Sequence, residues 1–375
     1  MQYEGAPAYF SVQLQLLEAC NLKCAHCYGG DVLLSGTPPL EEIRRRIDAI
    51  YSLGAQLGVV PDIHLSGGEP TLRRDLVEIV RYIFDDKSGD ALLFTNGTQW
   101  TSPFARALYD AGLRFVQVSL EGPEDLNDAI RGRGVYALAM QTLQMLREHG
   151  FRLTVSITVT AINFDSLFAF IESLDAPDVH VHLREVLPLG GGQRLPSLAP
   201  EQRRRLFKWA IGWAGASTVG VEDPIHCSVS PDYASGRRGC VAGRNHFCVD
   251  LDGVVYPCRP LRLAVGHVSD LRAAWDSPAM QRLRERKFGG RCGRCELLSN
   301  CGGCRAHALA RGDAFGEDTR CFADELGLVR TPAEVRAVEF AERLGRGVWR
   351  ARLAAGRLLG HGVTSRKDHS ANGAT

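Results

Sequence analysis

Short runs of apolar and β-branched residues alternate with segments of helical period through the first half of the chain. The runs have the length and composition of strands. They predict strands at Ser11–Leu17, Asp62–Ser66, Ala91–Thr95, Phe115–Leu120, Leu153–Val159 and Val179–Val186. The helical periods predict helices at Leu40–Leu53, Arg74–Phe84, Pro103–Ala111, Ala137–His149, Asp165–Leu174 and Glu201–Trp213. Six successive β/α units indicate a parallel sheet with right-handed crossovers, which we expect to form a partial (β/α)6 barrel. An open doubly wound sheet is the alternative.

The order of these segments also predicts how the chain is divided. A Gly- and Pro-rich stretch at Leu189–Pro200 marks the end of the barrel, and a cysteine-rich part follows it. We therefore expect the barrel in residues 1–190, a linker helix region in 191–225, a small cysteine-rich domain in 226–325, and a C-terminal helix with a disordered tail in 326–375. In parallel sheets the chemistry lies at the carboxyl ends of the strands, because the loops there converge on one mouth.

Composition narrows the classes of partner. The chain has 375 residues, of which 45% are hydrophobic, so it can bury a large core. Its 44 Lys and Arg against 43 Asp and Glu leave a net charge of +1, which argues against a nucleic acid or an anionic membrane as partner. The N-terminus lacks the features of a signal peptide, and the apolar runs fall short of the ~18 residues of a membrane span. We expect a cytoplasmic protein.

The twelve cysteines change this picture because they are clustered. Three lie between Cys20 and Cys27, and nine lie between Cys227 and Cys321. In a reducing compartment, clustered cysteines are more often metal ligands than disulfides. Two cofactor regions are therefore expected.

The first cluster has the pattern CxxxCxxC, at Cys20, Cys24 and Cys27, directly after the first strand. A zinc site would need a fourth Cys or His nearby, and His26 lies between two of the thiols, where its ring cannot easily reach the same ion. Three thiolates from one loop suit three corners of a [4Fe–4S] cluster and leave the fourth iron open. This pattern resembles the signature of the radical S-adenosylmethionine (radical SAM) superfamily.

A second stretch fits the same family. Residues Gly67, Gly68, Glu69 and Pro70 follow the second strand and look like the GGEP motif, in which the backbone and Glu69 receive the methionyl ammonium of SAM. The physical chemistry agrees with this role. Glycines allow the backbone to approach a ligand closely, and a carboxylate is a suitable acceptor for a desolvated ammonium group.

The resemblance also implies SAM contacts further along the chain. Asn96 and Ser119, at the ends of the third and fourth strands, would meet the ribose and methionine ends of the cofactor. Arg131 would pair with the methionyl carboxylate, and Leu183 would contact adenine. The order of these residues and their positions at strand ends support them as a set.

The spacing of the second group of cysteines has two possible interpretations, zinc sites or iron–sulfur clusters. Paired CxxC units alone indicate zinc ribbons. Beside the first motif, the spacing Cys-x12-Gly-x4-Cys, CxxC-x5-CxxC and a final Cys resembles the SPASM extension of radical SAM enzymes, which carries two auxiliary [4Fe–4S] clusters. Residues Phe247–Tyr256 supply the hairpin expected there, with Asp252-Gly253 as a two-residue turn.

The resemblance assigns the thiols of this second group. The outer cluster takes Cys292, Cys295, Cys301 and Cys321, and the inner cluster takes Cys240, Cys258 and Cys304. Cys227 is the candidate fourth ligand of the inner cluster, although its distance along the chain is unusually long. The last pair is spaced x2 where x3 is common. Without Cys227 the inner cluster would have an open iron that could bind substrate. Cys248, in the hairpin, is expected to be a buried structural thiol.

By resemblance, the protein is an oxidoreductase that cleaves SAM to a 5′-deoxyadenosyl radical, which abstracts a hydrogen from the substrate. It would need an electron donor such as flavodoxin or ferredoxin. The first hypothesis is a maturase of ribosomal peptides, working with a separate peptide-recognition protein because only nineteen residues precede Cys20. The second is a dehydrogenase or decarboxylase of a small molecule, such as an aminocyclitol, a sugar, a nucleoside or a tetrapyrrole. The third is a zinc-stapled binding protein.

We assign no general base, since Glu185 is expected to form a structural ion pair.

Overall fold

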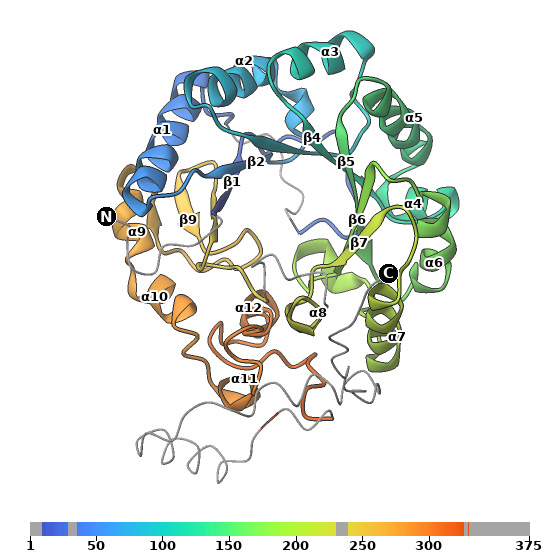
Figure 1. The fold of residues 1–375 in the computed structure, drawn as a ribbon, viewed down its shortest axis with the longest axis vertical. Coiled ribbons are helices and arrows are strands. Elements are labelled where there is room, and N and C mark those ends of the chain that lie inside the picture. The colour runs from blue at the N-terminus through green and yellow to red at the C-terminus, as the bar shows by residue number, and fades with distance from the viewer. Residues whose placement is uncertain (1–9, 29–35, 230–238, 326–328, 330–375) are drawn as a thin grey trace, which may run out of the picture.

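A computed structural model describes residues 10–28, 36–229, 239–325 and 329. The expected C-terminal helix and tail at 326–375 lie outside the described residues, apart from Val329. Figure 1 shows a ring of strands with the helices arranged around its outer side. No helix among the described residues is long and apolar enough to cross a membrane.

Six parallel strands form the centre of the sheet. They are β1 Ser11–Gln15, β2 Asp62–Ser66, β3 Ala91–Thr95, β4 Phe115–Leu120, β5 Arg152–Val159 and β6 Val179–Glu185. Each pairs in parallel with the next, so the strand order never reverses. The partial barrel is thus confirmed, and the doubly wound alternative, which requires a reversal of strand order, is wrong.

Four further strands extend the sheet at both edges. Strand β7, Thr218–Val221, pairs in parallel with β6, and β8, His246–Val249, pairs in parallel with β1. Strands β9, Val254–Tyr256, and β10, Gly266–His267, complete a ten-stranded sheet beyond β8. The cysteine-rich region therefore continues the barrel sheet rather than lying apart from it.

Helices on the outer side connect the strands. They are α1 Leu40–Leu57, α2 Leu76–Arg81, α3 Ser102–Asp110, α4 Glu124–Arg131, α5 Val135–Glu148, α6 Phe164–Ser173 and α7 Pro200–Ile211. Short 3-10 turns are η1 Pro70–Leu72, η3 Gly190–Arg194 and η5 Val268–Asp270, and α2 continues into a π-helical turn, η2 Tyr82–Asp86. Helix α1 runs past the expected end at Leu53 and stops at Gly58, which has a left-handed φ of 74°. Helix α4 was not predicted, because its eight residues are fewer than the roughly 11 over which a helical period can be recognised.

The two faces of the barrel strands differ in polarity. Side chains that face the helices, such as Leu65, Val181 and Leu183, are completely buried in the apolar core. Alternate residues on the same strands, such as His64 and His182, are polar and retain 16% and 22% side-chain exposure. Because side chains of a strand point alternately to opposite faces, these polar residues line the inside of the ring. The interior of the barrel is thus a polar lumen.

The hairpin in the cysteine-rich region differs in detail from the expectation. Strands β8 and β9 are antiparallel, with Val249 opposite Val255. The amide of Asp250 donates to the Val254 carbonyl at 3.0 Å, so three residues form the loop, and the expected two-residue turn is wrong. Asp250 explains the longer loop, because its carboxylate accepts from the Asp252 and Val254 amides.

Short helices make up the remainder of this region. They are α8 Pro224–Val229, α9 Leu271–Trp275, α10 Pro278–Arg284, α11 Gly290–Arg294 and α12 Arg305–Leu309. The expected division between residues 225 and 226 falls inside α8. Cys248, on β8, is completely buried, as predicted.

Candidate active site and cysteine clusters

The first three cysteines lie in the loop that follows β1, and several elements hold this loop in place. The Ala25 amide donates to the Ile130 carbonyl of α4 at 2.8 Å, and the Gly191 amide donates to the Cys27 carbonyl at 2.9 Å. A Cβ on Gly191 would lie only 2.3 Å from the Ala25 oxygen. The glycine-rich segment that was interpreted as a domain boundary therefore packs against the cysteine loop.

The three thiols of this loop influence one another electrostatically. Burial raises the pKa of Cys24 to about 11, Arg131 opposes this rise, and Cys20 and Cys27 add to it. Bringing three thiolates together in a partly buried loop is therefore costly without a compensating cation. An iron–sulfur cluster fits this donor set, because binding to iron stabilises thiolates.

The glycines of the GGEP-like motif allow one loop to approach another. The amides of Gly68 and Glu69 donate to the carbonyls of Leu17 and Ala19, at 2.8 and 2.9 Å. A Cβ on Gly68 would lie 2.1 Å from the Ala19 oxygen, and one on Gly67 would lie 2.3 Å from the Leu17 oxygen. Both glycines thus make room for the chain that leads into Cys20, a role that sequence reasoning had attributed to the ligand alone.

Glu69 is 1% exposed and has no cationic partner among the described residues. Its carboxylate accepts hydrogen bonds from the Thr71 and Thr95 hydroxyls, both at 2.7 Å, and from the Asn96 amide at 2.6 Å. Burial raises the pKa of Glu69, and these hydrogen bonds oppose the rise. Pro70 is buried beside it and begins η1. A carboxylate buried in this way suits an ammonium ligand, and the SAM assignment of Gly67, Gly68, Glu69 and Pro70 stays a prediction.

Glu121 is a buried charged residue near this loop that sequence reasoning missed. It is completely buried at the end of β4, where it accepts from His26 Nε2 at 2.6 Å and from the Thr158 amide at 2.7 Å, and it forms an ion pair with Arg131. Burial raises the pKa of Glu121, but Arg131 and His26 outweigh this and hold it below its ordinary value. Its position directly after Ser119-Leu120 in a strand-end segment was the available signal.

Arg131 has an unused hydrogen-bond donor. Its side chain is 8% exposed, its Nη1 lies 4.0 Å from Cys24 Sγ, and its Nε is buried without a partner. A buried donor without an acceptor is uncommon, and an anionic ligand beside the cysteine loop would satisfy it. This orphaned atom fits the carboxylate of SAM.

The other predicted SAM contacts lie in different surroundings. Asn96 is 7% exposed, and its side chain donates to Asn21 at 2.9 Å and approaches Cys20 Sγ at 3.9 Å. Ser119 is half-buried on β4, opposite Ser156 of β5. Leu183 is completely buried in the core beneath the helices. The structure thus brings Asn96 to the cysteine loop, and the roles of all three stay predictions.

A charged group inside the lumen was also missed by sequence reasoning. Arg184 of β6 pairs with Glu222, just after β7, at 2.6 Å, and His182 lies 3.6 Å from the same carboxylate. The Glu222 side chain is 49% exposed, and burial raises its pKa. Arg184 outweighs burial and keeps the pKa of Glu222 low, and Arg184 itself lies near Tyr28 and Cys258. The lumen group therefore lies between the two cysteine regions.

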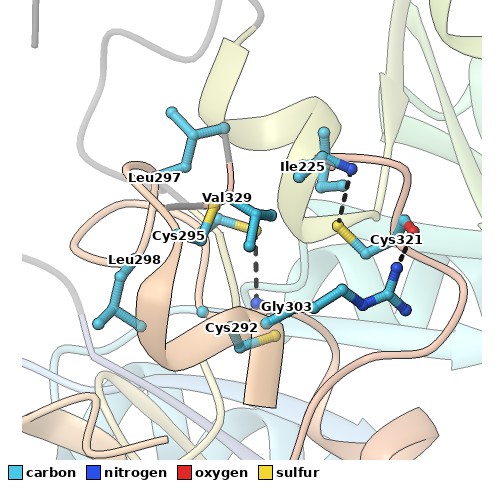
Figure 2. A pocket seen from close by; sticks show the side chains of 12 residues that line it. Ile225, Cys292, Cys295, Leu297, Leu298, Gly303, Cys321 and Val329 are labelled. Carbon is cyan, nitrogen blue, oxygen red and sulfur yellow. Dashed lines mark hydrogen bonds between the residues drawn. The ribbon is translucent and has the colours of Figure 1, made fainter. Parts of the chain in front are cut away.

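Four thiols of the second region surround one pocket. Figure 2 shows Cys292, Cys295 and Cys321 around it, with Ile225 and Val329 among its apolar lining, and Cys301 also contributes. The thiols accept hydrogen bonds from nearby amides, such as Ala323 to Cys321 at 3.4 Å. Burial raises the pKa of Cys321 to about 12. This is the set that the sequence assigned to the outer cluster.

Three further thiols form the inner group. Burial raises the pKa of Cys258 well above its ordinary value, and Cys240 and Cys304 add to the rise, so the three lie near one another. The Cys240 amide donates to the Cys301 carbonyl at 2.8 Å and joins the two groups. Cys227 lies in α8 and donates its thiol to the Val221 carbonyl at 3.4 Å, so its role as a fourth ligand stays a prediction.

In the described part of the chain, no three His, Cys, Asp or Glu side chains lie close enough to hold a single metal ion.

A buried ion network connects this region to the barrel. Glu185 accepts from Arg203 at 2.7 Å and from Arg320 at 2.8 Å, and Arg320 also pairs with Asp318 at 3.0 Å. The carboxylate of Asp318 in turn accepts from the Cys304 amide at 2.9 Å. The expectation that Glu185 forms a structural ion pair is confirmed, and the network fixes the inner thiols relative to β6.

Comparison with protein families matches residues 14–174 to the radical SAM superfamily and residues 240–305 to an iron–sulfur cluster-binding domain, SPASM. The chain is 30% identical to the mycofactocin maturase MftC of Mycolicibacterium smegmatis, over 85% of this chain and 84% of that protein. It is 28% identical to an AdoMet-dependent heme synthase of Methanosarcina barkeri, over 82% of this chain and 94% of that protein.

Solved structures share the fold. SuiB of Streptococcus suis, bound to S-adenosylmethionine, superposes with a TM-score of 0.66 at 15% identity, over 84% of this chain and 77% of that chain. The structure of anSMEcpe with bound AdoMet superposes with a TM-score of 0.68 at 19% identity, over 84% of this chain and 94% of that chain.

Proposed function

Because this chain belongs to the radical SAM superfamily and its SPASM subgroup, we propose that it is a peptide-modifying oxidoreductase with one SAM-binding and two auxiliary [4Fe–4S] clusters. When bound, the first cluster and SAM supply a 5′-deoxyadenosyl radical that removes a hydrogen atom from the substrate. Membership of this enzyme family replaces the zinc-stapled binding protein as an explanation of the cysteine pattern.

Different residues of the first site bind different parts of these cofactors. Cys20, Cys24 and Cys27 ligate the cluster, and Arg131 offers its unpaired Nε to the SAM carboxylate. Glu121 keeps Arg131 and His26 in position from a completely buried site. Glu69 offers a buried carboxylate to the SAM ammonium, and Gly67 and Gly68 keep that carboxylate close to the cysteine loop.

The lumen group contacts the substrate. Arg184 offers donors and Glu222 an acceptor, on a wall that lies between the first cysteine loop and Cys258. Their partial exposure supports this role, since it leaves both side chains accessible to a bound molecule. The surrounding strands restrict access of bulk water to the reacting centre.

In the second region, the outer cluster takes Cys292, Cys295, Cys301 and Cys321, and the inner cluster takes Cys240, Cys258 and Cys304, with Cys227 as fourth ligand. The convergence of the outer four on one pocket supports this division. An electron donor such as flavodoxin or ferredoxin, and a separate peptide-recognition protein, complete the proposed system.

Peptide modification rests on one observation, the 30% identity to a mycofactocin maturase over 85% of the chain. A second candidate function, modification of a tetrapyrrole, is favoured by the 28% identity to a heme synthase over 82% of the chain. The two candidates differ in the size and charge of the molecule that enters the lumen, so a direct substrate comparison separates them.

The test begins with cofactor content. Anaerobically reconstituted protein should hold about twelve irons, four for each of three clusters. Cys24→Ala should lose about four irons and all formation of 5′-deoxyadenosine. Cys248→Ala is the matched control, because this buried cysteine has no assigned cluster, and it should keep the full iron content.

The reduced protein is then incubated with SAM and either any short precursor peptide that is found encoded beside its gene or an iron tetrapyrrole precursor. Mass spectrometry should show 5′-deoxyadenosine together with loss of hydrogen from a peptide. Modification of the tetrapyrrole alone would replace the first proposal with the second. Protein that binds zinc and no iron would contradict both.

A further inference from the structure

Arg305, the first residue of α12, is a buried cation beside a cysteine of the outer group. It directly follows Cys304 and is 1% exposed. Its Nη2 donates to Cys292 Sγ at 3.4 Å, and its Nη1 donates to the carbonyls of Ala314 and Gly316, at 3.2 and 2.5 Å. Its guanidinium also stacks over the Phe288 ring, 4.3 Å from the centroid. The side chain is therefore held in one position by hydrogen bonds and packing.

None of these partners carries a formal negative charge when the thiol is protonated. Arg305 forms no ion pair among the described residues, and the nearby carboxylates Glu317 and Asp318 pair with Arg291 and Arg320 instead. A buried guanidinium without a counter-ion is strongly unfavourable, because it has lost its hydration and gained no opposite charge. An anion next to Cys292 Sγ would therefore stabilise the Arg305 guanidinium.

Arg286 is a second buried cation near these cysteines. It is 6% exposed, and it donates to the Cys301 carbonyl at 2.7 Å and to the Asn300 carbonyl at 3.2 Å. No carboxylate partner is present for it among the described residues, and its Nε has no acceptor. Two buried cations therefore lie next to the segment from Cys301 to Cys304.

The short spacer between Cys301 and Cys304 is shaped to admit both guanidiniums. A Cβ on Gly302 would lie 1.7 Å from Arg286 Nη1, and a Cβ on Gly303 would lie 2.6 Å from Arg305 Nη2 and 2.9 Å from Cys292 Sγ. Both glycines also have left-handed φ values, of 74° and 61°. The two glycines of this spacer thus leave room for Arg286 and for the contact between Arg305 and Cys292.

We propose that Arg305 is the built-in counter-ion of the outer auxiliary cluster. A cluster held by four thiolates is anionic and becomes more so on reduction, so a cation hydrogen-bonded to one ligand sulfur favours the reduced state. Arg305 therefore raises the midpoint potential of the outer cluster and makes it the better electron acceptor. It is a positioning and tuning residue, and the proposal rests on the outer cluster of the proposed function.

The experiment compares midpoint potentials by redox titration followed by electron paramagnetic resonance. The outer cluster is identified as the signal missing from Cys295→Ala. Arg305→Met, which keeps the volume and removes the charge, should shift the ratio of reduced to oxidised outer cluster at least tenfold towards the oxidised form, or about 59 mV for one electron. Arg305→Lys should recover part of that shift. Arg311→Gln, which removes an exposed charge just after α12, should change nothing.

Each outcome decides the proposal. An Arg305→Met protein with full iron content and an unchanged potential overturns it. If Arg305→Met loses the outer cluster, Arg305→Lys decides: iron retained by Lys supports a role for the charge, and iron lost from both variants shows that only packing matters. Wild-type protein with about four irons would contradict the auxiliary clusters themselves, and this separates failure of the proposed function from failure of the tuning role.

Discussion

Replacing Glu121 with Gln should damage both the stability of the barrel and its affinity for SAM. Glu121 is 0% exposed and is the carboxylate partner of Arg131, which is itself only 8% exposed. Gln has the same shape as Glu, so the Thr158 amide and the His26 ring remain in contact with the side chain at position 121. What is lost is the negative charge, and a buried guanidinium remains without its counter-ion.

The expected size follows from this burial. Removing one partner of a buried ion pair typically costs about 3–5 kcal/mol. Arg131 keeps its approach to the Cys24 thiol and can donate to the new amide oxygen, so about 3 kcal/mol is expected. At about 2–4 °C per kcal/mol, the midpoint of thermal unfolding should fall by about 6 °C or more.

The assay measures thermal unfolding of the anaerobic, cluster-free protein, with Glu222→Gln as the matched control. Glu222 also pairs with an arginine, but its side chain is 49% exposed, and such pairs contribute about 1 kcal/mol or less. In the cluster-loaded protein, SAM binding measured by calorimetry should weaken about ten- to a hundredfold for Glu121→Gln, as for other residues that orient a cofactor ligand. Equal unfolding midpoints for the two variants, or an unchanged Kd for SAM, would refute the role given to Glu121.

Three further outcomes are expected. Gly68→Ala should prevent assembly of the first cluster, because the added Cβ would lie 2.1 Å from the Ala19 oxygen, and an iron content equal to wild type would contradict this. Burial raises the pKa of Glu185, but Arg203 and Arg320 outweigh it and keep the pKa low, so its stabilising contribution is present above about pH 4.3 and is lost as the pH falls through the lowered value. Glu185→Gln should therefore unfold with a weaker dependence on pH in acid titrations, and identical profiles would exclude the ion pair. Arg131 lies beside Cys24 and has an unpaired Nε, so Arg131→Gln should weaken SAM binding without removing iron, which calorimetry and iron analysis can check independently.

Much of the fold was predictable because the pattern of apolar residues within each segment favours the same strand or helix that the segment forms in the structure. Strands β2, β3 and β4 have the predicted bounds, since each is a β-branched or apolar run between clear turn signals. The pairing of β8 with β1 was not predictable. It joins residues more than two hundred positions apart, and no periodicity in either strand encodes its partner.

The sequence alone indicated that the thiols form two separate groups, because loop spacing controls how ligands can converge on one cofactor. It predicted Cys20, Cys24 and Cys27 as one set and separated them from the nine cysteines from Cys227 to Cys321. Only the tertiary structure decided which charges surround these thiols. Glu121, Arg184, Glu222 and Arg305 carry no motif, and each acquires its role from burial and from partners on distant strands or loops. The strength of a charge interaction depends on the distance between the two groups and on their burial, and neither quantity can be predicted from the order of residues alone.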